Sequence, residues 1–156
     1  SDAMRKTMRT ALLLAAAVGL GACQTHNAME DDAIATGTGQ TVVLNIVSGP
    51  DQPHPVTMAL QLAGHALDDG RAVVLFFNVK AVDVPLKSLP ADLAYHDKPI
   101  AALLEKLIDR GATVLVCPHC MKAQGIDADD LVDGAEVADR LKLFRQIDAG
   151  AVVFTY

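Results

Sequence analysis

The sequence has no Trp, and aromatic residues make up only 4% of its 156 residues. Proteins that bind single-stranded nucleic acid stack bases on aromatic side chains, so this scarcity argues against that class. Basic residues are also few, because 13 Lys and Arg stand against 19 Asp and Glu, a formal net charge of −6. Binding to phosphate requires a basic surface, so we do not expect nucleic acid as a partner.

Cysteine, glycine and proline are no more frequent than in an average globular protein, at 3, 11 and 7 residues. These counts exclude collagen-like, disordered and disulfide-scaffold proteins. Long hydrophobic runs are missing as well: the apolar stretch near the N-terminus covers only residues 11–20, whereas a membrane-spanning helix needs about 20 apolar residues. Hydrophobic residues nevertheless amount to 51% of the chain, which is enough for the core of one domain.

The N-terminal segment is expected to be a lipoprotein signal. Residues 1–3 are typical of an expression scar, and Met4 is the expected natural start. Basic residues within 5–9 precede the apolar run, an order typical of a secretory signal. The run ends in LGAC (residues 20–23), which resembles a bacterial lipobox, where the Cys is lipidated and the chain is cleaved before it. An ordinary signal peptide or a short buried helix is the alternative.

Lipidation of Cys23 would hold the protein stably at a membrane, because several acyl chains on one residue anchor far better than one. Gln24 follows where an Asp would change the sorting, so we expect an outer-membrane lipoprotein that faces the periplasm. The chain then divides into a scar plus signal peptide (1–22), a lipidated flexible tether (23–40) that lacks hydrophobic periodicity, and a folded domain (41–156).

The folded domain repeats a strand–helix unit. Gly70, Gly111 and Gly150 each end an amphipathic helical pattern, as expected of a left-handed residue that closes a helix. The apolar face of the second pattern runs over residues 100–108, and the narrower stripe of the third begins at Val137. A short apolar run directly follows each of them, and residues 41–47 supply a first strand. The runs are almost uniformly apolar, which is typical of parallel strands buried on both faces. The expected strands after the glycines are 71–77, 112–116 and 151–156.

Alternation of this kind predicts an α/β fold, doubly wound, with a mainly parallel sheet and helices on both faces. A Rossmann dinucleotide site is not supported, because Ser48-Gly49-Pro50-Asp51 follows the first strand where a G-x-G-x-x-G loop would stand. A P-loop is absent too, and no cofactor is expected.

The chemistry of the domain is expected at the C-x-x-C motif Cys117-Pro118-His119-Cys120. The motif directly follows a predicted strand and opens a short helical stretch, so the thiols lie at the carboxyl end of a parallel strand, where open α/β sheets place their sites. A helix N-terminus beside Cys117 favours the thiolate, which is the nucleophilic form, and a protonated His119 would act in the same direction.

Three other interpretations of the two thiols stay open. A structural disulfide would close a very short loop and therefore stabilise little. A zinc site needs about four ligands, and one C-x-x-C supplies two, while the five His follow no ligand spacing, so no metal is assigned. Inert buried thiols are the third. The tetrapeptide also occurs in periplasmic DsbA-type oxidases, but a thioredoxin fold would carry it early and a cis-Pro later, and no Pro follows Pro118.

Residues 41–156 resemble the DsrE/TusD/YchN-like sulfur-relay family. The resemblance is sharpest over residues 116–126, where Cys117 and Gly125 reproduce the family's spacing between a Cys after the third strand and a helix-ending Gly. It implies a YchN-like parallel sheet, similar to a flavodoxin-like layer sandwich, assembled as a homo-oligomer, commonly a trimer or hexamer. It also implies that Cys117 accepts a persulfide. Cys120 lies one helical turn later and would be a resolving or auxiliary thiol.

The function predicted from these features is an envelope-anchored DsrE-like thiol protein that accepts and transfers sulfane sulfur as a persulfide on Cys117. Its partners would be a sulfur donor and acceptor, or a redox protein, in the envelope. Two alternatives remain. An oxidising compartment favours a C-x-x-C thiol–disulfide redox protein cycling Cys117 and Cys120. A non-catalytic oligomeric module, which could bind a metal, belongs to a different class.

Residues in neighbouring loops are candidates for binding substrate beside the thiols. Loops at the carboxyl edge of a doubly wound sheet flank its site, so residues 49–54, including His54, are expected near Cys117. Prolines in this region, at 50, 53 and 55, would stiffen that loop. Asn78 and Lys80 after the second strand would form a further rim, where Lys80 could attract an anionic sulfur donor. Alternatively, His54 and Lys80 are merely solvated loop residues.

Overall fold

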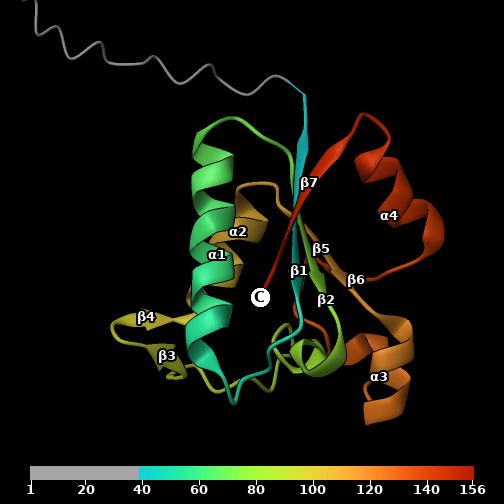
Figure 1. Ribbon diagram of the computed structural model, residues 1–156. Helices are drawn as coiled ribbons and strands as arrows, with labels where there is room; N and C mark the ends of the chain where they lie inside the picture. Colours follow the sequence, from blue (N-terminus) through green and yellow to red (C-terminus); the bar gives the residue numbers. More distant parts are fainter. Residues whose placement is uncertain (1–38) are drawn as a thin grey trace, which may run out of the picture. The chain divides into compact units, whose positions relative to one another are not determined.

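The computed structural model describes residues 39–156 (Figure 1). The expected signal peptide (1–22), the lipidation site Cys23 and the tether up to residue 38 lie outside the described residues. Within residues 39–156, no helix is both long enough and apolar enough to cross a membrane.

A parallel sheet forms the centre of the domain, with its strands in the order β6-β5-β2-β1-β7. Every neighbouring pair in this sheet is parallel, which confirms the α/β fold with a mainly parallel sheet that the uniformly apolar runs predict. A separate antiparallel hairpin consists of β3 and β4. The strands are β1 (Thr41–Ile46), β2 (Val73–Phe77), β3 (Ala94–Tyr95), β4 (Lys98–Pro99), β5 (Thr113–Val116), β6 (Ala135–Val137) and β7 (Ala151–Thr155).

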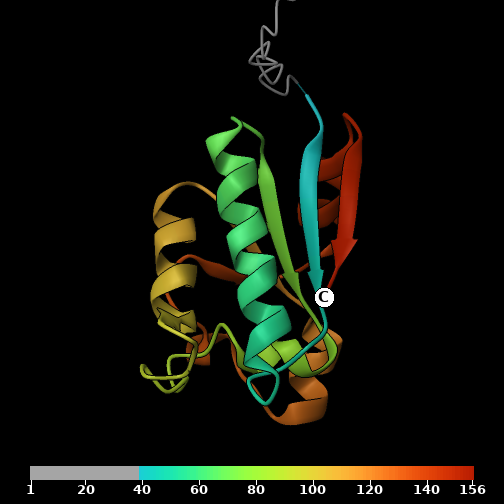
Figure 2. The ribbon, with the colours of Figure 1, turned by 60° about the vertical axis from the view of Figure 1, so that its left-hand side comes forward.

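Helices cover both faces of the sheet (Figures 1 and 2). On one face, α1 (Pro53–Asp68) and α2 (Ile100–Asp109) enclose the larger core, in which Leu44 and Leu75 of the sheet pack with Leu60 and Leu104 of the helices. On the other face, α4 (Arg140–Ile147) lies over a small cluster that contains Val43, Val74, Leu115 and Ala138. The alternation of side chains along each strand distributes neighbouring residues between these two cores.

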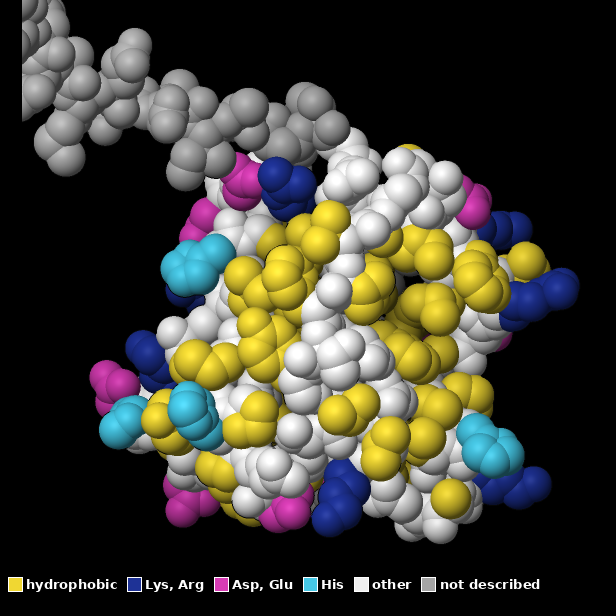
Figure 3. Space-filling model, in the orientation of Figure 1, with side chains coloured by type: hydrophobic (Ala, Val, Ile, Leu, Met, Phe, Trp, Pro, Cys, Tyr) yellow, Lys and Arg dark blue, Asp and Glu magenta, His cyan; other side chains and the backbone are white. Residues whose placement is uncertain are grey.

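The second face is only partly covered. No residue of α4 is buried, and β7, at the edge of the sheet, leaves apolar side chains in solvent. Figure 3 shows hydrophobic side chains gathered over α4 and β7. The exposed members, which we call the α4–β7 patch, are Leu141, Phe144, Val152, Val153 and Phe154.

Glycine ends the helical segments as the sequence predicts. Gly70, Gly111 and Gly150 have φ values of 73°, 91° and 97°, in the left-handed region that closes a helix before the next strand. The apolar face predicted for residues 100–108 is also found, because Ile100, Leu104 and Leu107 of α2 are buried.

Two details of the predicted elements are wrong. Helix α1 begins at Pro53, so Pro53 and Pro55 belong to its first turn and do not stiffen a loop. Proline suits that position because the first helical N–H has no intrahelical partner. Val137, predicted on the stripe of the last helix, lies in β6 and pairs with Val116 of β5. A strand of three residues is too short to show a periodicity in the sequence.

Candidate functional site

The two cysteines lie where β5 passes into α3 (Pro118–Gln124), at the carboxyl edge of the sheet (Figures 1 and 2). Cys117 is the N-cap residue of α3, and its backbone N–H donates to the carbonyl of Phe77 in β2 at 2.9 Å. Pro118 begins the helix, and Gly125 ends it with a left-handed φ of 70°. Both thiols are free and half-buried, so reagents can reach them.

Cys120 is held by the segment that follows β2. This segment is the 3₁₀ helix η1 (Val79–Asp83), which packs against α3. The Val79 N–H donates to Sγ of Cys120 at 3.2 Å, and Nε2 of Gln124 donates to the Val79 carbonyl at 2.8 Å. Positions 120 and 124 are one helical turn apart, so one face of α3 hydrogen-bonds both the N–H and the carbonyl of Val79.

Val79 has an unusual backbone. Its φ is 54°, in the left-handed region, and a β-branched residue is rarely found there because its side chain crowds the backbone. Such a conformation persists only where surrounding contacts impose it, and it concentrates at functional sites. Here the contacts are the hydrogen bonds to Cys120 and Gln124. The side chain of Val79 is 53% exposed, so burial of the side chain explains little of it.

The two thiols differ in their electrostatics. The pKa of the Cys120 thiol is raised above its ordinary value. The largest cause is a hydrogen bond with Cys117, and the second is desolvation by burial. The Val79 N–H acts in the opposite direction, because it stabilises negative charge on the sulfur. The raised pKa makes Cys120 a poor nucleophile near neutral pH. Cys117, at the N-cap of α3, is therefore the candidate for nucleophilic attack.

Asn78 and Lys80 lie in the expected rim, but each has a partner of its own. Nδ2 of Asn78 donates to Oδ1 of Asn45 at 2.6 Å, which ties the carboxyl ends of β2 and β1 together. Nζ of Lys80 lies 3.6 Å from Oδ2 of Asp51, in an exposed ion pair. Lys80, Asp51 and Asp83 line a cavity of about 530 Å³ beside Gln124. The carboxylates outnumber Lys80 in this cavity, so its attraction for an anionic sulfur donor is small.

His54 does not lie in a loop, contrary to expectation. It occupies the first turn of α1 and stacks on the ring of Tyr95 in β3, with ring centroids 4.0 Å apart and planes 8° apart. In the sheet, β2 lies between β1, which precedes His54, and β5, which precedes Cys117. The segment after β2 is therefore the direct neighbour of the thiols. His119 is exposed on α3, one residue before Cys120.

Sequence reasoning missed Val79 and Gln124. No sequence signal announces a left-handed valine, since this residue type avoids that region. Gln124 could have been found, because it follows Cys120 by four residues on the same predicted helix and so shares its face.

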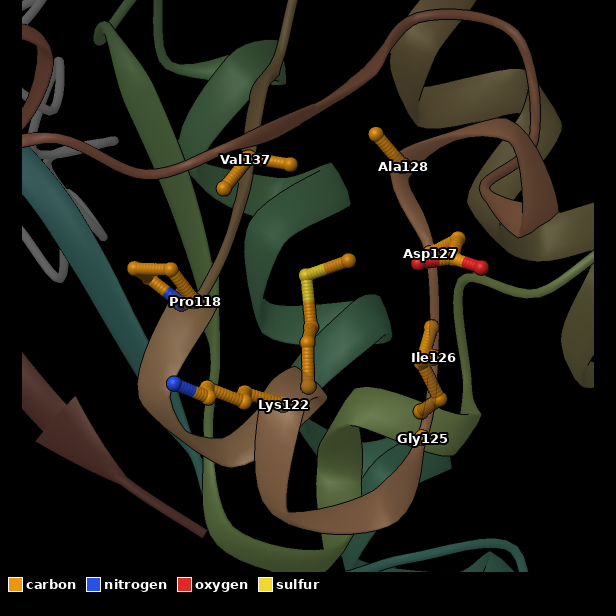
Figure 4. Close-up of a pocket in the computed structure, with 8 residues that line it drawn as sticks. Pro118, Lys122, Gly125, Ile126, Asp127, Ala128 and Val137 are labelled. Atoms are coloured by element: carbon orange, nitrogen blue, oxygen red, sulfur yellow. The ribbon is translucent and has the colours of Figure 1, made fainter.

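A second cavity, of about 480 Å³, adjoins α3 without including a cysteine. Figure 4 shows it between Pro118 and Lys122 of α3 and the segment from Ile126 to Ala128, with Val137 of β6 along another side. Among residues 39–156, no group of three or more His, Cys, Asp or Glu side chains is arranged to hold a metal ion.

With this geometry in view, comparison with known families identifies the class. The model of the DsrE/DsrF-like family matches residues 41–156, and the chain belongs to this family. Members of the family are generally associated with sulfur relay. The relationship predicted from residues 116–126 is thereby confirmed.

Individual relatives agree with this assignment. The chain is 30% identical over 106 residues to the uncharacterized protein MK0008 of Methanopyrus kandleri, covering 67% of this chain and 85% of the relative. It is 32% identical over 99 residues to the uncharacterized protein MJ0989 of Methanocaldococcus jannaschii, covering 63% and 83%.

Solved structures show the same fold. The ychN protein of E. coli superposes with a TM-score of 0.63 at 22% identity, over 76% of this chain and 99% of that one. MTH1491 of Methanobacterium thermoautotrophicum, a protein of unknown function, superposes with a TM-score of 0.58 at 17% identity, over 75% and 99%. The predicted YchN-like fold is thereby confirmed.

Proposed function

We propose that this protein accepts sulfane sulfur as a persulfide on Cys117 and passes it to an acceptor. The observation that carries the proposal is the position of Cys117 at the N-cap of α3, at the carboxyl edge of the sheet, where it is free and half-buried. A second free thiol, Cys120, lies in the same helix, and its pKa is raised. Membership of a family associated with sulfur relay supports the same chemistry.

The proposed step is a displacement at sulfur. The Cys117 thiolate attacks the terminal sulfur of a donor persulfide, a new S–S bond forms at its Sγ, and the donor leaves as a thiolate. A hydrogen bond from the Cys120 thiol would stabilise negative charge on Sγ of Cys117 before attack.

Intact mass tests this proposal. The reduced protein, treated briefly with polysulfide or with thiosulfate plus a rhodanese, should gain about 32 Da, located on the peptide that contains Cys117. The Cys117→Ser variant should gain nothing under the same conditions. A gain that persists in Cys117→Ser, or no gain in both the wild-type chain and Cys120→Ser, would refute the assignment.

A thiol–disulfide redox protein is the second candidate. A hydrogen bond between the two thiols favours the redox candidate, because two sulfur atoms within hydrogen-bonding distance can form a disulfide with little movement. An oxidising envelope would promote that reaction. A loss of about 2 Da after exposure to a disulfide donor, without any gain from polysulfide, would favour this candidate over sulfur transfer.

We also propose that the protein acts as a homo-oligomer, a trimer or a hexamer, joined through the α4–β7 patch. Support comes from the apolar side chains on that patch and from the outer edge of β7, which has no partner strand among residues 39–156 and is a template for further pairing. A non-catalytic binding module would use the same surface.

Anchoring in the bacterial envelope, with the domain facing the periplasm at the outer membrane, belongs to the proposal as well. It is supported by the sequence that ends at Cys23. The Cys23→Ser variant should yield a soluble or uncleaved precursor when membranes are separated from soluble protein. A Cys23→Ser protein that is cleaved and still membrane-bound would contradict lipidation at this residue.

A further inference from the structure

We propose that this site also discharges its own persulfide: Cys120, positioned by the main chain of Val79, attacks the persulfide on Cys117 and releases sulfide. The proposal rests on the function proposed above, since it needs sulfur to reach Cys117 first. It gives the protein a second activity, sulfide release from bound sulfane sulfur. It assigns Val79 and Gln124 as positioning residues for that step.

The first argument is geometric. Left-handed valine is unfavourable by about 1–3 kcal/mol, so the contacts that impose it have to outweigh that cost. Those contacts come from a single helix face, through Sγ of Cys120 and Nε2 of Gln124. Their combined effect is to aim one N–H donor, at 3.2 Å, at the sulfur of Cys120 and not at that of Cys117.

Such a donor is useful only if Cys120 carries negative charge at some stage. A backbone N–H stabilises a thiolate much more than a thiol, because hydrogen bonds to charged acceptors are the stronger ones. In the unloaded pair the pKa of Cys120 is raised, so its thiol is protonated near neutral pH. We therefore infer that the Val79 N–H acts mainly in a later state, in which Cys120 is the thiolate.

Loading of sulfur produces that state. Once Sγ of Cys117 bears a second sulfur, it is no longer an anion that accepts the Cys120 proton. The hydrogen bond with Cys117 is the largest cause of the raised pKa of Cys120, so its loss moves that pKa down from its level in the unloaded pair; burial still raises the pKa, and the Val79 N–H opposes that effect. Cys120 is thus a better nucleophile after sulfur has bound than before, which places the two reactions in order.

The step balances without an external oxidant. The Cys120 thiolate attacks Sγ of Cys117, the bond between that Sγ and the terminal sulfur breaks, and hydrosulfide leaves with the persulfide proton. The sulfane sulfur is reduced to sulfide, and the two cysteines are oxidised to a disulfide. A thiol reductant must then regenerate the pair, so a dithiol protein of the same compartment is the class of partner that completes the cycle.

The experiment follows mass and sulfide together. The full chain is reduced, treated briefly with polysulfide and separated from excess reagent, and both signals are recorded over time. In the wild type, the form heavier by about 32 Da should convert to one lighter by about 2 Da, with about one sulfide per chain. In Cys120→Ser, the heavier form should persist, and no sulfide should appear until a reductant is added.

Two further variants test the positioning role. Gln124→Ala removes the bond to the Val79 carbonyl, and Val79→Pro removes the N–H together with the left-handed φ, which proline cannot adopt, so each should slow sulfide release by about 10-fold. Val79→Gly keeps the N–H and adopts a positive φ without strain, so release should proceed near the wild-type rate. Gln52→Ala is the matched control, because Gln52 is an exposed glutamine that caps α1 without a side-chain hydrogen bond.

The pH profile separates positioning from a general loss of structure. Gln124→Ala should raise the pH at which release is half-maximal, because a poorly held N–H lowers the pKa of Cys120 less. A variant that only loosens the fold would lose thermal stability without moving this midpoint. Should Val79→Pro fail to fold, Gln124→Ala, which changes an exposed side chain, still decides the question.

The outcomes distinguish the two proposals. If neither the wild-type chain nor Cys120→Ser gains sulfur, the proposed function fails, and this inference fails with it. If Cys120→Ser holds sulfur while the wild-type persulfide is stable and no sulfide appears, only the discharge step is refuted. Release at the wild-type rate and midpoint in both Gln124→Ala and Val79→Pro would overturn the role of Val79.

Discussion

The strained backbone of Val79 gives a quantitative prediction about stability. Replacement by glycine should remove about 1–3 kcal/mol of left-handed strain. It should cost about 0.5–1 kcal/mol through the greater freedom of unfolded glycine. The valine side chain is 53% exposed, so its lost burial costs about half of the 1.5–3 kcal/mol of a fully buried one. Val79→Gly should therefore leave the free energy of unfolding within about 1 kcal/mol of the wild type.

Val82, in the same 3₁₀ helix, supplies the control. It is completely buried and has no positive φ, so Val82→Gly relieves no strain and leaves a cavity. It should cost about 3 kcal/mol or more and lower Tm by roughly 10 °C. Urea unfolding by circular dichroism, at one protein concentration and under reducing conditions, measures both, since the chain has no Trp for fluorescence. Equal destabilisation by the two variants would refute the claim that Val79 is strained.

Three other predictions concern the thiols, the patch and the histidine stack. Near neutral pH, alkylation should label Cys117 before Cys120, with Cys120 labelled only as the pH rises through its raised pKa; peptide mass that shows the reverse order would exchange their roles. Phe154→Asp should shift the oligomer toward monomer in analytical ultracentrifugation, because it places a charge in an apolar interface; an unchanged mass would exclude the α4–β7 patch. His54→Ala should show the same pH dependence of the Cys117 thiolate absorbance as the wild type, because His54 packs on Tyr95; a difference between the two curves would show that His54 acts on the site.

Much of the fold follows from the sequence because its signals are local. Each of Gly70, Gly111 and Gly150 stands between a helical pattern and an apolar run, and a left-handed turn at these positions depends only on neighbouring residues. The parallel sheet follows from runs that are apolar on both sides, since only a doubly covered strand buries them. Elements without such signals were missed or misplaced, including β6 and the start of α1.

The site divides along the same line. The sequence alone determined that two thiols stand at the start of a helix after a buried strand, because motif, strand and helix are adjacent in the chain. Only the tertiary structure decided which loop meets them. The order β5-β2-β1 inserts the segment after β2 between the thiols and His54, and so brings the main chain of Val79 to Cys120. Strand order depends on packing between distant segments, and a hydrogen bond from backbone N–H leaves no trace in residue types.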